Sequence, residues 1–262
     1  MDLQLKGQHV LITGGSRGLG LACAQGFVRE GAKVSLVGRD QDRLDAAVAQ
    51  LRQEGFEAAG FSADLTDAAA AAAMVEAVEA AAGPVDVLVN SAGAAKRVPF
   101  KELTPAAWQN SMQAKFFSYI NVTDPLIKRM GDRGRGVVIN IVGMGGKIAS
   151  TVHISGGAAN AALMLATAGL AAAYAPLGVR VNAVNPTVTH TDRMGEGLKA
   201  EARAFNITEE QALHKVQSKM PLGRVAKPED VANTVVFLAS PLAGYVSGAI
   251  LSVDGAGSPT VV

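Results

Sequence analysis

The stretch Thr13-Gly14-Gly15-Ser16-Arg17-Gly18-Leu19-Gly20 lies between an apolar run, residues 9–12, and the start of a helical pattern. Glycines let a backbone approach a pyrophosphate without Cβ clashes, and a helix that begins near Gly18 directs its amides and positive dipole end at that anion. The spacing of Gly14, Gly18 and Gly20 differs from the more frequent Gly-x-Gly-x-x-Gly, so the context must support the motif. We interpret the stretch as a turn that binds a dinucleotide.

The composition favours one cytoplasmic domain. The chain has 262 residues, 49% of them apolar, which is enough to bury a full core, and we expect a single domain over residues 1–262. The net charge of +1 gives no field for nucleic acid or an anionic membrane. Cys23 is the single cysteine and indicates a reducing compartment, and residues 1–7 lack the apolar run of a signal peptide.

Strand and helix patterns alternate along the rest of the chain. Further strands are expected at residues 33–37, 56–61, 85–89, 137–141 and 179–184, with helices at 40–54, 68–82, 105–130 and up to 174. Parallel strands need crossover connections that pack back onto the sheet. The prediction is an α/β fold, a single-domain Rossmann-type doubly wound parallel sheet of about seven strands, with ligands at the carboxyl ends of the strands.

Five motifs, in this order, resemble the short-chain dehydrogenase/reductase family over nearly the whole chain. They are residues 13–20, Asp64-Leu65-Thr66, Asn90-Ser91-Ala92-Gly93, residues 181–186, and the tail from Pro221-Leu222-Gly223-Arg224 to Val253-Asp254-Gly255. The resemblance implies that Asp64 binds the adenine edge and that Thr191 holds the nicotinamide carboxamide. The cofactor-binding residues expected on this basis are Gly14, Ser16, Arg17, Gly18, Leu19, Gly20, Arg39, Asp64, Leu65, Asn90, Ala92, Gly93, Pro186 and Thr191.

The end of the second strand indicates which cofactor is bound. An acid about twenty residues after the glycines would bind a ribose 2′-hydroxyl, but Gly38 and Arg39 stand there. Arg39 and Arg17 offer planar cationic donors to a 2′-phosphate, so NADP(H) is expected. Asp40 keeps NAD(H) open as the second choice, because its side chain could turn inward.

The family's catalytic residues are replaced in this sequence. Family members usually carry an asparagine, a serine, a tyrosine and a lysine, and the flanking motifs assign these to Lys115, Gly143, Gly156 and Asn160. No tyrosine lies between Tyr119 and Tyr174, so a shift of the alignment does not restore the set.

Four residues are candidates for a rebuilt catalytic site. His153 suits proton transfer near neutral pH, with a polar loop residue as the alternative. Lys115 could cross the space left by the tyrosine and return a positive charge near the ribose together with Asn160, unless it points outward. Tyr119 could add a phenol, although an aromatic residue at helical spacing is more often in the core.

Three functions stay open. The first is an NADP(H)-dependent oxidoreductase that acts on a carbonyl or alcohol substrate through a non-standard site. The second is a lyase, decarboxylase or isomerase on the same fold, and the third is a non-catalytic NADP-binding protein. We expect no metal site, a substrate lid at about residues 190–220, and a homotetramer or homodimer, because the helix at 155–174 is apolar on nearly all sides.

Overall fold

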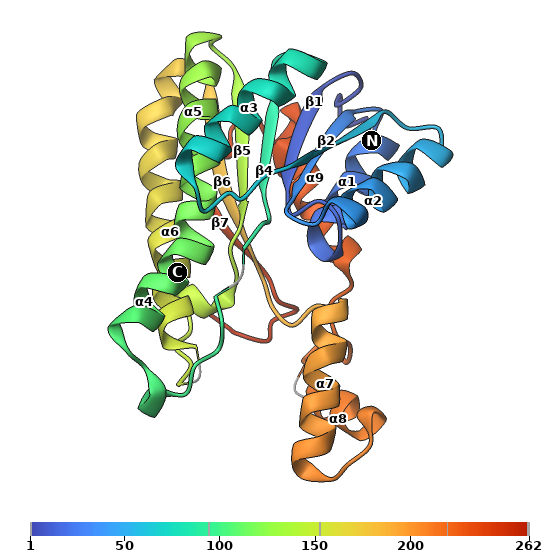
Figure 1. Ribbon diagram of the computed structural model, residues 1–262, viewed down its shortest axis with the longest axis vertical. Coiled ribbons are helices and arrows are strands. Elements are labelled where there is room, and N and C mark those ends of the chain that lie inside the picture. The colour runs from blue at the N-terminus through green and yellow to red at the C-terminus, as the bar shows by residue number, and fades with distance from the viewer. Residues whose placement is uncertain (1, 94, 152, 219, 261–262) are drawn as a thin grey trace.

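The computed structural model describes residues 2–93, 95–151, 153–218 and 220–260. Its centre is a seven-stranded sheet in the order β3-β2-β1-β4-β5-β6-β7, and every pairing is parallel. The strands are β1 (His9–Thr13), β2 (Lys33–Gly38), β3 (Ala58–Ser62), β4 (Val87–Asn90), β5 (Gly136–Ile141), β6 (Val179–Pro186) and β7 (Ile250–Val253) (Figure 1). The predicted Rossmann-type sheet is confirmed.

Helices cover both faces of the sheet. One apolar core lies between the sheet and α1 (Gly18–Arg29), α2 (Gln41–Gln53) and α9 (Pro228–Ala239). The other lies under α3 (Ala68–Ala82), α5 (Ser118–Asp132) and α6 (Ile154–Tyr174) (Figure 1). The sheet is thus doubly wound, and the loops at the carboxyl ends of its strands remain accessible to ligands.

The alanine-rich stretch at 68–82 is an ordinary amphipathic helix, as its pattern predicts. The Asp67 side chain caps α3 by accepting from the Ala69 and Ala70 N–H groups. Met74, Val75 and Val78 are buried on one face, and Gly83, with a φ of 81°, ends the helix.

The helix predicted at 105–130 is interrupted in its middle. It consists of α4 (Pro105–Ser111), the π-helical segment η2 (Met112–Phe117) and α5. Gly93 packs against this segment so closely that a Cβ there would lie 2.0 Å from the Ala114 carbonyl oxygen. π-helical turns are rare and frequently mark functional sites. The long helix is present as predicted, but its π-helical segment was not predicted, because apolar periodicity does not reveal one extra residue in a turn.

Residues 190–218 form an arm beyond the carboxyl edge of the sheet. The arm contains α7 (Asp192–Phe205) and α8 (Glu209–Gln217), which project away from the sheet as a pair (Figure 1). Asn206 takes the left-handed conformation between them, with a φ of 51°, and Thr208 begins α8 with a capping box.

Helix α6 is strongly apolar although much of its surface is exposed. In the stretch Ile154–Leu177, 28% of the most apolar 18-residue window is buried, and Leu165 is 77% exposed. By length and composition alone this helix could cross a membrane, a test that core helices of soluble proteins also pass. Its apolar outer face is available to a neighbouring molecule.

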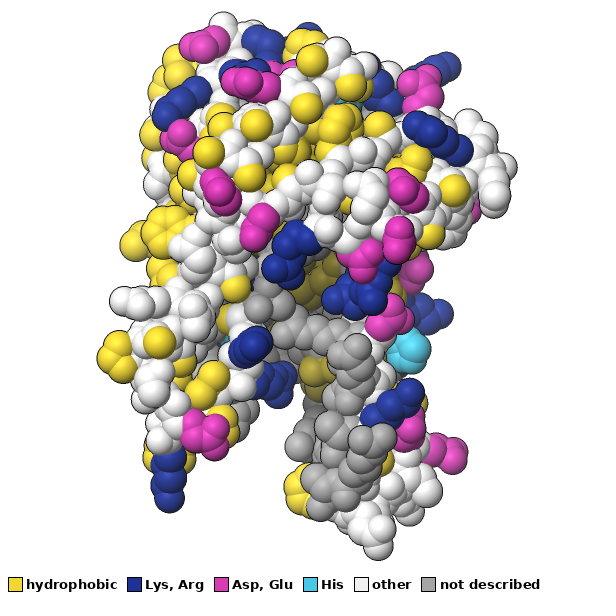
Figure 2. Space-filling model, in the orientation of Figure 1, with side chains coloured by type: hydrophobic (Ala, Val, Ile, Leu, Met, Phe, Trp, Pro, Cys, Tyr) yellow, Lys and Arg dark blue, Asp and Glu magenta, His cyan; other side chains and the backbone are white. Residues whose placement is uncertain are grey.

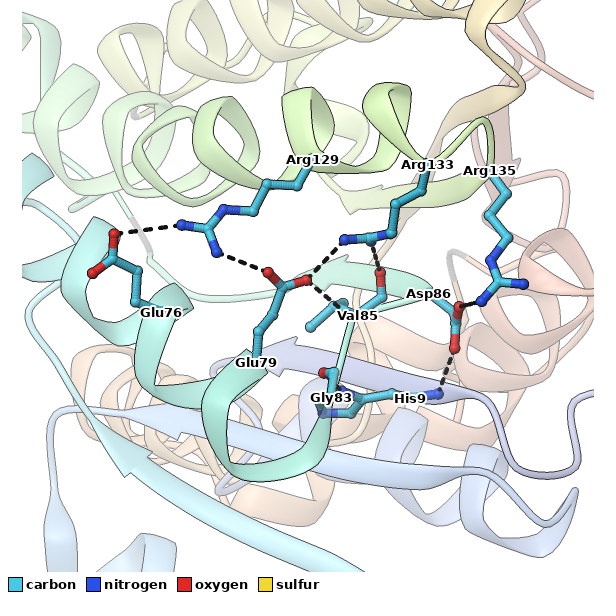
Figure 3. Close-up of polar contacts among 9 residues, drawn as sticks. All are labelled: His9, Glu76, Glu79, Gly83, Val85, Asp86, Arg129, Arg133 and Arg135. Carbon is cyan, nitrogen blue, oxygen red and sulfur yellow. Dashed lines mark hydrogen bonds and ion pairs between the residues drawn. The ribbon is translucent and has the colours of Figure 1, made fainter.

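A polar network closes the amino edge of the sheet (Figure 3). Glu79 on α3 accepts hydrogen bonds from the Val85 N–H at 2.9 Å, from Arg129 at 2.9 Å and from Arg133 at 3.1 Å. His9 on β1 bonds through Nδ1 to the Gly83 carbonyl at 2.8 Å and is buried. These contacts join α3, α5 and β1 on the side opposite the glycine-rich turn.

This network predicts that acid destabilises the protein. Burial tends to raise the pKa of Glu79, but the hydrogen bonds from Val85 and Arg129 and the two arginine charges outweigh it and hold that pKa below its usual range. Burial lowers the pKa of His9. For both groups the unfolded state binds protons more readily, so the free energy of unfolding should fall as the pH drops below about 6.5, through His9 first and then Glu79.

Denaturation by urea between pH 7 and pH 4 measures this dependence. Glu79→Gln should lower the free energy of unfolding by about 1–3 kcal/mol at pH 7. It should also flatten the dependence of that free energy on pH below about pH 4.5. Asp124→Asn, which breaks an exposed ion pair with Lys128, should stay within about 1 kcal/mol of the parent. A Glu79→Gln curve parallel to that of the parent would show that Glu79 does not cause the acid loss.

Candidate active site

The glycine-rich turn brings the ends of β1 and β4 together. The Thr13 hydroxyl accepts from the Ser91 and Ala92 N–H groups at 3.0 and 3.1 Å. Gly14 has a φ of 66°, and a Cβ at Gly20 would lie 2.2 Å from the Gly14 carbonyl oxygen. Helix α1 then begins without a side-chain cap, so its first amides face the turn. The turn has the close backbone and open helix start that a pyrophosphate needs.

The end of β2 offers cations and no available carboxylate. Asp40 is the N-cap of α2: one oxygen accepts from the Arg43 N–H at 3.1 Å and the other pairs with Arg43 Nε at 3.0 Å. This use of its side chain argues against the inward-turned Asp40 that NAD(H) would need. Arg39 is exposed at the strand end, and Ser16, Arg17 and Arg43 line one hollow of the surface. Arg17, and Arg39 at the end of β2, therefore fit a 2′-phosphate.

Asp64 lies after β3, as its motif predicts. It accepts from the Thr66 N–H at 3.0 Å and from the Thr66 hydroxyl at 2.8 Å, and these bonds, with a smaller contribution from the Arg39 charge, lower the pKa of its carboxyl. The group is therefore an ionised acceptor at neutral pH, which suits an adenine amino group.

Lys115 points into the protein. It is 7% exposed, and its Nζ donates to the Ile141 carbonyl at 2.9 Å and to the Tyr119 hydroxyl at 2.6 Å. The outward alternative for Lys115 is wrong. Tyr119 is fully buried, donates to the same carbonyl at 2.6 Å, and has its pKa raised by burial. Tyr119 is a core residue, as the more frequent case predicts, and its phenol is a poor acid.

His153 occupies the space of a side chain at position 156. Helix α6 begins at Ile154, and a Cβ on Gly156 would lie 2.1 Å from His153 Cε1 and 2.5 Å from Nε2. The ring also borders the loop after β5, with Cδ2 3.3 Å from the position of a Cβ on Gly145. The imidazole thus lies where a side chain at position 156, which the sequence resemblance assigns to a tyrosine, would leave the helix.

Asn160 faces the same loop. It is buried, and its Nδ2 lies 3.5 Å from the position of a Cβ on Gly143 and 3.4 Å from that on Gly145. Gly143 has a φ of 127°, a conformation that disfavours side chains. The structure therefore brings His153 and Asn160 to one glycine loop, and it places the Lys115 ammonium at the strand end that leads into this loop.

Three polar side chains near the site, Ser111, Ser155 and Asn185, are not among the predicted site residues. The Ser111 and Ser155 hydroxyls are both buried and lie 2.8 Å apart, which joins α4 to α6. Asn185 accepts from the Gly143 N–H at 3.2 Å and so holds the glycine loop. Ser155 is the second residue of α6, and nothing in the sequence indicates that it pairs with Ser111.

The Asn90 side chain turns into the sheet rather than toward the turn. It donates to Thr123 and to Asn140, both at 2.9 Å, and Asn140 donates to Thr167 at 2.9 Å. Polar residues inside apolar strands are the sequence signal for such a network. The Asn90 side-chain nitrogen is therefore used inside the sheet, and the residue is fully buried.

The arm begins beside the glycine-rich turn. Pro186 ends β6, and Thr191 is the N-cap residue of α7. The Thr191 Cγ2 lies 3.7 Å from the position of a Cβ on Gly18. His190 is exposed and bonds through its backbone to Ala226 at 2.8 Å. Among the residues described, no group of three or more His, Cys, Asp or Glu side chains could hold a metal ion.

The sheet and the glycine-rich turn define a Rossmann-type nucleotide-binding protein. Residues 14–257 match the family model described as enoyl-(acyl carrier protein) reductase. The chain belongs to the short-chain dehydrogenase/reductase family. It is 34% identical to 2-(S)-hydroxypropyl-CoM dehydrogenase 3 of Xanthobacter autotrophicus, over 97% of this chain and 98% of that protein. It is also 34% identical to the 3alpha-hydroxysteroid dehydrogenase of Mediterraneibacter gnavus, over 98% and 99% of the two chains.

Two solved structures are similar over nearly their whole length. L-sorbose reductase from Gluconobacter frateurii, complexed with NADPH and L-sorbose, has a TM-score of 0.95 and 30% identity, with 100% of both chains covered. An NADPH-bound short-chain oxidoreductase from Pseudomonas aeruginosa PAO1, described as containing an atypical catalytic center, has a TM-score of 0.88 and 30% identity, over 97% and 98% of the chains.

Proposed function

We propose that this protein is an NADP(H)-dependent oxidoreductase that reduces a small carbonyl compound, or oxidises the corresponding alcohol, through a non-standard active site. The family and its named dehydrogenases and reductases support the reaction class. The observation that carries the non-standard site is the His153 imidazole, which fills the space of a side chain at Gly156.

The cofactor would be held along the carboxyl edge of β1 to β6. Bound NADP(H) supplies the hydride donor or acceptor. Arg17 and Arg39 would bind its 2′-phosphate, and the cap role of Asp40 makes NAD(H) the weaker ligand. The residues proposed to hold it are Gly14, Ser16, Arg17, Gly18, Leu19, Gly20, Arg39, Asp64, Leu65, Asn90, Ala92, Gly93, Pro186 and Thr191.

His153 is the proposed proton carrier at the substrate oxygen. An imidazole titrates near neutral pH and can both give and take a proton there. Asn160 borders the same loop and would hydrogen-bond in the same network. The Lys115 ammonium, held at the Ile141 carbonyl, would add positive charge behind the loop and favour a developing oxyanion.

Lys115→Met tests this role. The variant keeps the length of the side chain but removes the charge and three donors. The free energy of cofactor binding should become less favourable, or the activation free energy of turnover should rise, by at least about 1.5–3 kcal/mol. Lys128→Met on the exposed face of α5 is the control and should leave both unchanged. A Lys115→Met variant that binds NADPH and turns over like the parent would remove Lys115 from the site.

We propose that residues 1–262 form one NADP-binding domain of a cytoplasmic enzyme, with α7 and α8 as its substrate lid. The arm begins at the glycine-rich turn, which supports a lid that closes over bound cofactor. The small-molecule substrate would enter between the arm and the loop after β5.

We also propose a homotetramer or a homodimer through α6. The exposed apolar face of this helix supports a symmetric contact. Light scattering at micromolar concentration should give a mass of two or four chains. Leu165→Glu should lower that mass, and a monomeric parent would contradict the proposal.

Absorbance of reduced nicotinamide tests the main proposal. A panel of ketones and aldehydes should contain at least one compound that the protein reduces with NADPH. One mole of NADPH should be consumed for each mole of alcohol formed. NADPH binding without turnover would favour the non-catalytic protein. Conversion of a substrate without net change in NADPH would favour a lyase, decarboxylase or isomerase.

A further inference from the structure

The Lys and Arg side chains at the two edges of the sheet differ in whether they pair with carboxylates. At the amino edge Arg129, Arg133 and Arg135 each pair with a carboxylate, of Glu79 or Asp86 (Figure 3). At the carboxyl edge, loops after four strands carry cations, namely Arg17 after β1, Arg39 after β2, Lys96 and Arg97 after β4, and Lys147 after β5. These cations share the edge with Asp40 after β2, Asp64 after β3 and Asp254 after β7. Cations gathered near a binding site raise the local concentration of anions.

Lys96 and Arg97 are the members of this group that the cofactor does not explain. Both are exposed and follow the end of β4 by a few residues, next to Ala95, which is buried. Within the described part of the chain, neither forms an ion pair with a carboxylate. Lys and Arg side chains gather on the wall of the notch between the main body and the arm (Figure 2).

Two carboxylates at the same edge have partners of their own. Asp40 is bound to Arg43, and Asp64 is bound to Thr66. On the next loop, Lys147 donates to the Ile250 carbonyl at 3.3 Å. Within the described residues no carboxylate is paired with Lys96 or Arg97, so both charges are available to a ligand.

We infer that the substrate carries an oxyanion, a carboxylate or a phosphate, and that Lys96 and Arg97 bind it. This inference rests on the proposed function, since it names the class of carbonyl compound. Arg97 has the planar donor pair that matches an oxyanion, and Lys96 adds a compact charge beside it. The two would act as specificity residues at the entrance, while His153 serves the carbonyl group.

Matched pairs of small ketones test the inference. The probes are 4-oxopentanoate with its methyl ester, and dihydroxyacetone phosphate with dihydroxyacetone. The variants are the parent, Lys96→Gln with Arg97→Gln, and the control Lys6→Gln with Lys128→Gln, which removes two exposed charges elsewhere. For each pair we would measure KM with NADPH, and the Kd for the NADP-loaded protein by calorimetry, at low and high salt.

In the parent, one anion should bind at least about tenfold more tightly than its neutral partner, and this gap should shrink with salt. The Lys96 and Arg97 variant should lose most of the gap, with the neutral probe unchanged, and the control should keep it. A gap for 4-oxopentanoate over its methyl ester would identify a carboxylate substrate, and a gap for dihydroxyacetone phosphate over dihydroxyacetone would identify a phosphate substrate.

The outcomes separate this inference from the proposed function. Equal affinity for both members of each pair in the parent, or a gap that survives in the Lys96 and Arg97 variant, overturns the oxyanion site even if ketones are reduced. Anion binding that depends on these two residues without any oxidation of NADPH supports the site and counts against the oxidoreductase.

Discussion

Replacement of His153 by phenylalanine should lower turnover by about 10²-fold or more and leave the affinity for NADPH unchanged. A positioned acid or base contributes about 10²–10⁴-fold to a rate, and this variant removes both ring nitrogens. Phenylalanine keeps a planar ring beside Gly156, so the packing at the start of α6 is preserved. Steady-state kinetics would give kcat, and fluorescence titration would give the Kd for NADPH.

The control is Gln53→Phe, because Gln53 is exposed at the end of α2, outside the proposed site and lid. It should turn over like the parent. Should His153→Phe keep the kcat and the pH profile of the parent, the imidazole would not be the proton carrier, and only its space-filling role would remain.

Arg39→Asp should reduce the preference for NADPH over NADH by about 10- to 100-fold. The change removes a charged hydrogen bond to the 2′-phosphate, typically about 1.5–3 kcal/mol, and puts a like charge beside it. Titration of the parent and the variant with both cofactors measures the preference. Arg29→Asp, the same charge change at the far end of α1, should leave it unaltered. Equal affinity of the parent for the two cofactors would contradict the assignment of NADP(H).

The fold could be predicted closely because each strand is an apolar run between turn signals. The alternation of such runs with amphipathic helices leaves few arrangements other than a doubly wound sheet. Element ends were less accurate: β3 begins at Ala58 rather than at 56, and β6 continues to Pro186. These ends depend on pairing with neighbouring strands, which no local pattern contains.

The site could be predicted only in part. The register of the motifs placed Lys115, Gly143, Gly156 and Asn160 together, and the structure does bring them around one loop. The position of the His153 ring could not be predicted, because it depends on how the chain enters α6. The depth of Lys115 depends likewise on the π-helical turn, which lets the side chain reach the Ile141 carbonyl.

This geometry changes what is needed to restore the family's usual residues. The register alone asks for asparagine, serine, tyrosine and lysine at 115, 143, 156 and 160. The structure adds a fifth change, since the His153 ring lies where a side chain at 156 must begin. A serine at 143 must also adopt the φ of 127° that Gly143 now has, or the loop must shift.

The overlap of His153 with the space above Gly156 has a consequence for how such sites evolve. A chain that gains a side chain at position 156 displaces the imidazole from the pocket in the same step, and a chain that loses that side chain opens the space for a ring at 153. Under the proposed function, one substitution at position 156 would therefore displace the proposed proton carrier without any change in the sheet.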